Sequence, residues 1–330
     1  MEYRYLGKTG VRVSKLCFGT MSFGGDADET VSAALYQRCR EAGINFFDCA
    51  NVYSFGKAEE ILGRLIASER DEVVITSKVY FPTGSGENAR GSSRYHILRA
   101  VEASLRRLST DRLDIYFLHR FDDFTDLEES LRALDDLVRQ GKILYPAVSN
   151  FAAWQVEKAL GIAARESLAR LVCIQPMYNL VKRQAEVELL PMAKAEGLGV
   201  IPYSPLGGGL LTGKHAYTVR SEKSRLATNK MYLARYSEEW MYTAANDFSA
   251  FARQRGWEPA GLAVAWAASH PAVTAPIIGA RSVQQLEGSL KSLEIEMTPE
   301  LRAQISAFTP EPPPATDRND EQSVNFMGAR

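Results

Sequence analysis

The chain has few cysteines and no long apolar run, and each absence excludes a class of protein. The four cysteines among 330 residues show no Cys-x-x-Cys spacing, so we expect reduced thiols rather than disulfides or metal ligands. No stretch approaches the ~20 apolar residues that a membrane-spanning helix needs. The N-terminus, residues 1–5, is too polar for a signal peptide. The sequence therefore predicts a cytoplasmic protein that is not embedded in a membrane.

An excess of charge of one sign is also lacking. The 39 Lys and Arg residues nearly balance the 40 Asp and Glu residues, so nothing draws the protein toward nucleic acid or an anionic membrane. With 45% hydrophobic and 24% charged residues, the composition is that of an ordinary globular protein. We expect a small-molecule partner, and the composition is equally compatible with a monomer and a homo-oligomer.

Strand and helix patterns alternate along the chain. Residues 2–6 and 11–16 flank a glycine-containing turn and predict a β-hairpin. Later apolar runs predict strands at residues 16–19, 45–48, 73–78, 113–119, 143–150, 171–175, 199–204 and 273–278. Helical patterns are expected at residues 29–42, 58–68, 94–108, 127–139, 152–165, 184–196, 238–255, 259–269 and 282–293.

The strand ends follow one another at intervals of 26 to 41 residues, with one interval of 75 residues before the eighth. One βα unit needs about 30 residues, and eight in series are typical of an α/β (β/α)8 TIM barrel. The alternative, an open doubly wound sheet, usually has fewer strands and often a glycine-rich turn after the first strand. Gly24-Gly25 is not that turn. We therefore predict one barrel domain over residues 1–330, with the hairpin capping one end and an extended or mobile tail at residues 310–330.

Polar residues stand where the apolar strands end. The run Ile44–Phe47 stops at Asp48, and a buried carboxylate is costly unless it is paired. Lys78, at the end of the next strand, is its expected partner. The carboxyl ends of barrel strands meet on one face, where active sites lie. The residues expected on that face are Thr20, Asp48, Lys78, His119, Ser149, Asn150, Gln175 and Tyr203.

This set suits proton transfer to an oxygen atom. A lysine beside a phenol stabilises the phenolate, so we expect Lys78 to lower the pKa of Tyr53 from about 10 and make it a general acid. His119 can hydrogen-bond the oxygen that receives the proton. Proton donation is half of a carbonyl reduction, and a hydride donor supplies the other half. The structural alternative is that Asp48 and Lys78 form only a buried ion pair.

At these residues the chain resembles the aldo-keto reductases, over nearly its whole length. Phe47-Asp48-x4-Tyr53, Thr76-Ser77-Lys78 and Leu118-His119 match the motifs of that family's catalytic tetrad. The resemblance implies that Asp48, Tyr53, Lys78 and His119 are its members, with Tyr53 as the proton donor.

The resemblance also implies NADPH/NADP+ as the cofactor. Ser149, Asn150 and Gln175 match the positions that hold the nicotinamide amide, and Tyr203 matches the aromatic residue that stacks on the ring. The other cofactor positions implied are Thr20, Met21, Asp48, Ser204, Leu206, Lys214, Gly279, Arg281, Gln285 and Ser289. Arg281 is the natural partner of the 2′-phosphate. The chain departs from the family at Gly288 and Ser289, where relatives often have Glu-Asn.

Two segments of the expected insertion have more than one interpretation. Residues 208–215 nearly match the motif of a phosphate-binding P-loop but lack its final hydroxyl residue. The better interpretation is a loop whose backbone lies along a cofactor phosphate. The basic stretch from Arg220 to Lys230 is either an anion clamp or a solvated part of a long loop.

These residues predict the reversible, NADPH-dependent reduction of an aldehyde or ketone to an alcohol. One alternative is an aldolase or lyase that forms a Schiff base on Lys78, although pairing with Asp48 would keep that lysine charged. Another is a non-catalytic NADPH-binding regulatory subunit, against which the complete tetrad argues.

Overall fold

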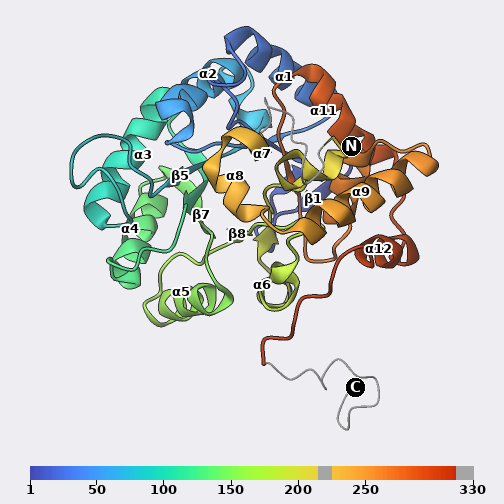
Figure 1. Ribbon diagram of the computed structural model, residues 1–330. Helices are drawn as coiled ribbons and strands as arrows, with labels where there is room; N and C mark the ends of the chain where they lie inside the picture. Colours follow the sequence, from blue (N-terminus) through green and yellow to red (C-terminus); the bar gives the residue numbers. More distant parts are fainter. Residues whose placement is uncertain (215–224, 317–330) are drawn as a thin grey trace.

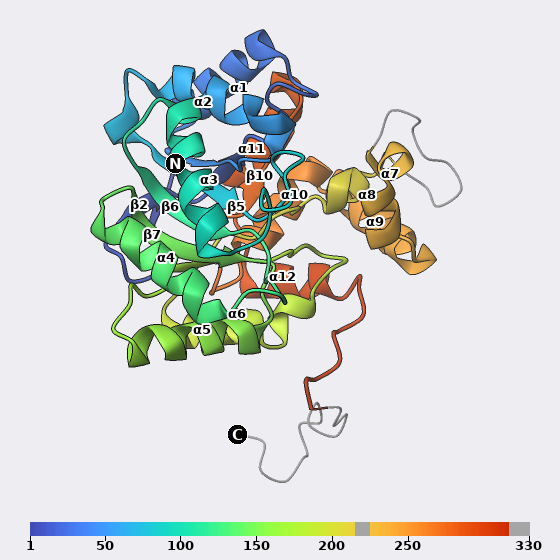
Figure 2. The same cartoon turned by 90° about the vertical axis from the view of Figure 1, so that its left-hand side faces the viewer.

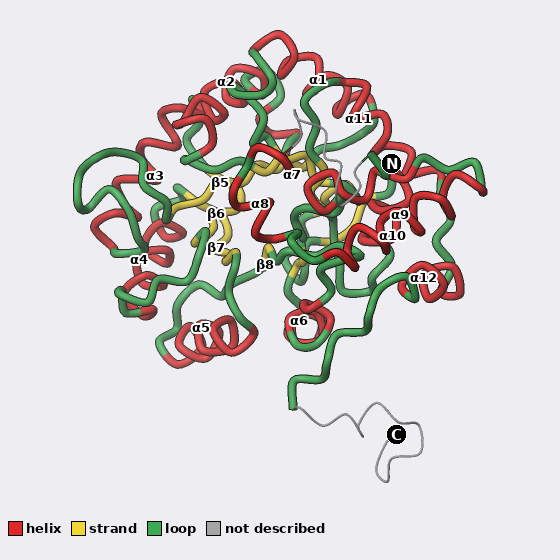
Figure 3. The backbone as a smooth tube through the Cα atoms, viewed as in Figure 1, coloured by secondary structure: helices red, strands yellow, loops and turns green. Residues whose placement is uncertain are grey.

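The computed structural model describes residues 1–214 and 225–316. Eight parallel strands form one sheet in the order β10-β3-β4-β5-β6-β7-β8-β9, and helices surround it (Figures 1 and 3). The sheet closes on itself, since the Thr274 amide donates to the Val200 carbonyl (2.8 Å) and the Ile277 amide donates to the Pro202 carbonyl (2.8 Å). The predicted (β/α)8 barrel is therefore confirmed. No helix in the described part of the chain is long and apolar enough to cross a membrane.

The strands span two to seven residues and the α-helices four to sixteen. The strands are β1 (Tyr3–Tyr5), β2 (Arg12–Ser14), β3 (Cys17–Gly19), β4 (Phe46–Asp48), β5 (Val74–Val79), β6 (Leu113–Leu118), β7 (Ile143–Ser149), β8 (Cys173–Gln175), β9 (Gly199–Val200) and β10 (Ile277–Ile278). The α-helices are α1 (Glu29–Glu41), α2 (Lys57–Ile66), α3 (Arg94–Leu108), α4 (Leu127–Arg139), α5 (Ala153–Arg165), α6 (Leu189–Glu196), α7 (Arg225–Thr228), α8 (Lys230–Arg235), α9 (Glu239–Gln254), α10 (Pro259–Ala268), α11 (Val283–Leu290) and α12 (Pro299–Ser306). Short 3-10 segments are η1 (Tyr53–Gly56), η2 (Arg70–Glu72), η3 (Gln184–Glu186), η4 (Gly207–Thr212) and η5 (Lys291–Glu294).

The β1–β2 hairpin caps the amino-terminal end of the barrel, as predicted. Leu6 and Val13 are fully buried and pack with the inward-facing side chains of the strands, among them Phe46, Ile115 and Phe117. A second, larger core fills the space between the strands and the helices. All four cysteines are buried and free, which confirms the expectation of reduced thiols.

Local sequence explains where the helices begin and end. The Asp28 side chain accepts a hydrogen bond from the Val31 amide (2.8 Å) and starts α1. After this helix Gly43 has φ +81°, a left-handed conformation that glycine adopts without strain. The expected helix over residues 184–196 is divided into η3 and α6, because Pro191 lacks an amide hydrogen and its ring would clash with the Val187 carbonyl of a continuous helix.

Three short helices were not expected. Helices α7 and α8 occupy part of the predicted long loop, and α12 follows the helix expected to be the last. The Asn229 side chain caps α8 by accepting from the Met231 amide (3.0 Å), and Thr298 caps α12 ahead of Pro299. Helices α7 to α9 lie at the end of the barrel away from the hairpin (Figure 2). Of the basic stretch, Arg220 and Lys223 lie outside the described residues.

The C-terminal tail is only partly described. Residues 310–316 contain no helix or strand, in agreement with the expected extended segment, and residues 317–330 lie outside the described part.

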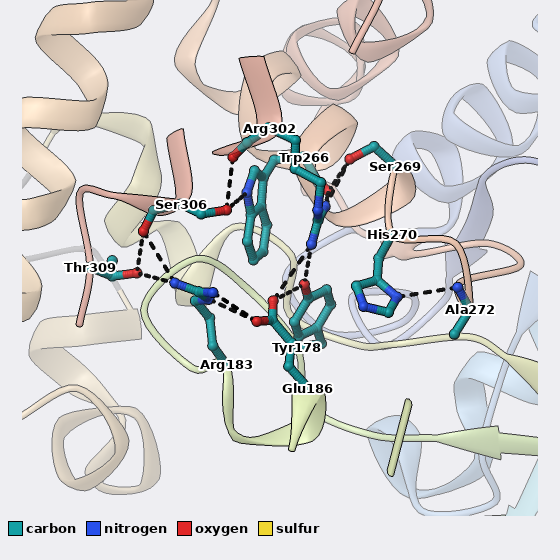
Figure 4. Close-up of polar contacts among 10 residues, drawn as sticks. All are labelled: Tyr178, Arg183, Glu186, Trp266, Ser269, His270, Ala272, Arg302, Ser306 and Thr309. Atoms are coloured by element: carbon teal, nitrogen blue, oxygen red, sulfur yellow. Dashed lines mark hydrogen bonds and ion pairs between the residues drawn. The ribbon is translucent and has the colours of Figure 1, made fainter. Parts of the chain in front are cut away.

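A polar network fastens α12 to the barrel (Figure 4). The Arg302 guanidinium donates to the Trp266 carbonyl (2.6 Å), to Ser269 Oγ (2.8 Å) and to the Tyr178 hydroxyl (2.7 Å). Tyr178 in turn donates to Glu186, and its ring stacks on Trp266 with 5.1 Å between centroids. Burial alone would raise the pKa of Glu186, but hydrogen bonds from Arg183 and Tyr178 lower it, so the carboxylate is charged at neutral pH.

We expect Arg302→Met to lower the free energy of unfolding by about 3 kcal/mol, because it leaves partly buried acceptors without their donor. Urea denaturation followed by circular dichroism measures the change. Arg64→Met is the matched control, since Arg64 lies at an exposed position of α2 and pairs with the exposed Glu29. A decrease for Arg302→Met no larger than that of the control would contradict the stabilising role of the network.

Candidate active site

Asp48 and Lys78 meet at the carboxyl ends of β4 and β5. Lys78 Nζ lies 2.6 Å from Asp48 Oδ2 and donates a second hydrogen bond to the Cys49 carbonyl (2.7 Å). The other carboxylate oxygen accepts from Thr76 Oγ1 (2.8 Å) and Gln175 Nε2 (2.8 Å). Both charged side chains are buried, Lys78 completely. The predicted pairing is observed, and the additional donors explain how a carboxylate is tolerated at this depth.

Tyr53 is brought over this pair by an unusual turn. It begins η1, and Lys78 Nζ donates to its hydroxyl oxygen at 3.3 Å. The next two residues, Ser54 and Phe55, have left-handed φ angles of +47° and +55°, which non-glycine residues adopt at an energetic cost. Ser54 Oγ donates to the Phe23 carbonyl (2.7 Å) and holds the turn. Backbone strain at this point therefore serves to place the phenol beside the lysine.

The direction of the pKa shift of Tyr53 differs from the expected one. Burial raises the pKa of Tyr53 to about 12, although Lys78 acts to lower it. The prediction of a lowered pKa is wrong for the protein alone, because lost hydration outweighs the effect of the lysine. Burial would lower the pKa of Lys78, but Asp48 and Tyr53 raise it above its ordinary value. At neutral pH the lysine is charged and the phenol keeps its proton.

His119 stands directly after β6 beside the phenol. The rings of Tyr53 and His119 have centroids 6.2 Å apart, and Phe81 contacts the imidazole edge-on at 4.9 Å. Burial, with a further contribution from Lys78, holds the pKa of His119 well below its usual value, so the ring is neutral. Neither ring nitrogen is hydrogen-bonded to a described residue, and Nδ1 is fully enclosed. A neutral imidazole with an unused Nε2 can hydrogen-bond a ligand oxygen.

Four further predicted residues, Tyr203, Asn150, Ser149 and Gln175, form a chain of hydrogen bonds at strand ends. The Tyr203 hydroxyl donates to Asn150 Oδ1 (2.7 Å), and Asn150 Nδ2 donates to the His119 carbonyl (2.9 Å). Ser149 Oγ donates to the Gln175 carbonyl (2.9 Å). The amide group of Gln175 is already bonded to Asp48, a contact that the sequence interpretation did not include.

A cavity of about 1490 Å³ lies over these strand ends. Thirteen of the predicted site residues line it: Met21, Asp48, Tyr53, His119, Asn150, Gln175, Tyr203, Ser204, Leu206, Lys214, Gly279, Arg281 and Gln285. Residues far apart in the sequence are thus brought together around one space, which is larger than a small carbonyl compound alone needs.

Four predicted residues do not line the cavity: Thr20, Lys78, Ser149 and Ser289. All four are buried behind its wall. Thr20 donates through its amide (2.9 Å) and its hydroxyl (3.0 Å) to the Asp48 carbonyl. On α11 it is Gly288, not Ser289, that reaches the cavity. The structure therefore does not favour a direct contact between a ligand and Thr20, Ser149 or Ser289.

Several lining residues were missed by the sequence interpretation. They include Ser22, Val52, Ser54, Tyr232, Arg235, Arg253, Trp257, Glu258 and Lys291. Many of them belong to the insertion after β9, for which the interval of 75 residues before the last strand was the only signal.

The lining of the cavity combines two kinds of chemistry. It includes the aromatic residue Tyr203 and the neutral His119, and it also includes Arg281, which precedes the amino terminus of α11. The Arg281 guanidinium is 4.0 Å from Asp26 and 37% exposed, so it remains accessible to a ligand. An aromatic surface together with a cation beside a helix amino terminus fits an elongated phosphate-bearing ligand such as a nicotinamide dinucleotide.

Comparison with known proteins agrees with this geometry. The sequence model of the Aldo/keto reductase family matches residues 15–309. The chain is 40% identical over 323 residues to "Uncharacterized oxidoreductase YrpG" of Bacillus subtilis, covering 94% of the chain and 97% of that protein. It is 37% identical to "Probable voltage-gated potassium channel subunit beta" of Oryza sativa subsp. japonica (96% and 99% covered). It is 34% identical to "Versiconal hemiacetal acetate reductase" of Aspergillus parasiticus (91% and 94% covered). The chain therefore belongs to the aldo/keto reductase family and is an oxidoreductase.

Proposed function

We propose that the protein reduces an aldehyde or ketone to the alcohol, reversibly and with NADPH. The observation that carries the proposal is the placement of a protonated Tyr53 beside the Lys78–Asp48 pair and next to a neutral His119. Reduced nicotinamide supplies a hydride to the carbonyl carbon when the cofactor is bound.

Tyr53 supplies the proton to the carbonyl oxygen. As its proton leaves, the phenol oxygen gains negative charge, and Lys78 Nζ at 3.3 Å stabilises that charge. Asp48 holds the ammonium group in place through the 2.6 Å contact. His119 orients the carbonyl oxygen by a hydrogen bond from its neutral ring. In the reverse direction Tyr53 accepts the proton of the alcohol.

A Schiff base on Lys78 is disfavoured. A nucleophilic amine must be unprotonated and exposed to the substrate. Lys78 Nζ donates to Asp48, Cys49 and Tyr53, its pKa is raised, and it does not line the cavity. Borohydride should therefore trap no substrate on this residue.

A regulatory subunit is the second candidate, because the rice relative carries the name of a potassium channel subunit. The test is to measure NADPH binding by fluorescence quenching and then cofactor oxidation with aldehydes, keto-sugars and quinones. Turnover supports the proposed reductase. Tight binding without turnover of any carbonyl would contradict it and favour the regulatory role.

We further propose that Arg281 selects NADPH over NADH by pairing with the 2′-phosphate. Arg281→Gln is expected to raise KM for NADPH about 10- to 100-fold, since a charge-assisted bond is lost, with little change for NADH. Steady-state kinetics with both cofactors measures the preference. Arg64→Gln on α2 is the matched control, because Arg64 pairs with Glu29 and neither residue lines the cavity. Equal losses for both cofactors would contradict the assignment.

A further inference from the structure

Arg235, the last residue of α8, lines the cavity without an acidic partner. Its guanidinium carbon lies 5.9 Å from the ring centroid of Tyr203 and 5.7 Å from that of Tyr232. Within residues 1–214 and 225–316, no carboxylate comes within 4.0 Å of the guanidinium and no acceptor is hydrogen-bonded to it. The contacts that hold it are aromatic faces, which leave its donors unused.

Neighbouring side chains connect Arg235 with the residues that we propose take part in the reaction. Arg235 lies over Tyr203, and the Tyr203 hydroxyl is bonded to Asn150. Asn150 is bonded to the His119 carbonyl, and the His119 ring faces Tyr53. Four consecutive contacts therefore connect the guanidinium with the proposed proton donor.

Other cavity cations serve a different region. Arg253 on α9 donates to the Gly213 carbonyl (3.4 Å), beside Lys214 in the segment expected along the cofactor pyrophosphate. Arg281 lies beside α11. Among the described residues, Arg235 has ring contacts with Tyr203 and Tyr232 and not with either of these segments.

A second cation, Lys182, lies near Arg235. Burial and the charge of Arg235 lower the pKa of Lys182, whereas Glu238 acts to raise it. No carboxylate pairs with Lys182 within 4.0 Å in the described part of the chain. An anion entering the cavity here would meet the guanidinium of Arg235, whose fork matches the two oxygens of a carboxylate.

We propose that Arg235 is a specificity-determining residue that binds a carboxylate carried by the aldehyde or ketone substrate. The inference rests on the proposed carbonyl reduction and narrows it to carbonyl acids. A single guanidinium without a partner matches a single carboxylate better than a phosphate dianion, which usually takes several donors.

The test compares carbonyl substrates that carry a carboxylate with their uncharged methyl esters. We suggest 4-carboxybenzaldehyde against its methyl ester, and succinic semialdehyde against its methyl ester, as one rigid and one flexible pair. The quantity measured is the ratio of kcat/KM for the acid to kcat/KM for the ester. The wild type is expected to prefer the acid in at least one pair. Arg235→Gln should lower that ratio about 10- to 100-fold, chiefly through KM of the acid, and Arg235→Lys should retain part of the preference.

Arg253→Gln is the matched control, because it removes another cavity arginine and should leave the acid-to-ester ratio unchanged. An equal loss for acid and ester in Arg235→Gln, with weaker NADPH binding by fluorescence quenching, would make Arg235 a cofactor contact and overturn the inference. A wild type that reduces the esters but shows no preference for the acids would overturn the inference alone. Absence of turnover for every carbonyl would overturn the proposed function and the inference with it.

Discussion

Replacing Tyr53 with phenylalanine is expected to lower kcat for carbonyl reduction by about 10²- to 10⁴-fold, the usual contribution of a positioned general acid. The variant keeps the ring between Lys78 and His119 but has no proton to donate. NADPH binding, measured by fluorescence quenching, should remain close to that of the wild type. Tyr80→Phe is the matched control, since Tyr80 packs on the lining residue Phe81 but does not itself line the cavity. Wild-type turnover by Tyr53→Phe would exclude this residue as the proton donor.

The pH profile of the wild type provides an independent check on Tyr53. A proton donor works only while protonated, so the rate of reduction is lost as pH rises through its pKa. Because burial raises the pKa of Tyr53 to about 12, reduction should stay level through neutral pH and fall only on the alkaline side. A fall centred near neutrality would point to a different acid.

Lys78→Met is expected to cause the second large effect, on stability as well as on activity. It leaves the buried Asp48 without a cation, which should lower the free energy of unfolding by about 3–5 kcal/mol. It also removes the positive charge that stabilises the Tyr53 oxygen, so kcat should fall with it. Urea denaturation and steady-state kinetics measure the two effects.

The double variant Asp48→Asn/Lys78→Met separates the two roles of Lys78. Removing both charges should restore much of the stability, because no unpaired ion is left in the barrel, but it should not restore turnover. If the losses of the two single variants simply add in the double variant, the pair does not act as a coupled unit.

The strand-end residues could be predicted because the barrel repeats. Once βα units of about 30 residues are recognised, Asp48, Lys78 and His119 must lie on the same face of the barrel, however the surrounding helices are arranged. The raised pKa of Tyr53 could not be predicted in this way, because it depends on how completely neighbouring loops exclude water from the phenol. The spacing of residues along the sequence predicts which side chains are neighbours, but it does not predict how deeply each side chain is buried.

Two other differences between the sequence predictions and the structure also have specific physical causes. Ser289 was expected at the cavity, but consecutive residues of a helix point about 100° apart, so a contact shifted by one residue falls on the other side of α11. Gly288 holds the position instead. Helix α8, which carries Arg235, spans six residues, too few for an amphipathic pattern to be recognised. Its place over the cavity depends on how the whole insertion folds.

The closure of the barrel also sets an order of events during synthesis on the ribosome. One edge of β3 pairs with β4, but its other partner, β10, comes only at residues 277–278. Arg4 of the hairpin likewise donates to the carbonyls of Ala268 and Val273 near the far end of the chain. A nascent chain therefore carries an open strand edge until most of it has been translated, and such edges invite pairing with other chains. The long insertion after β9 delays this closure further.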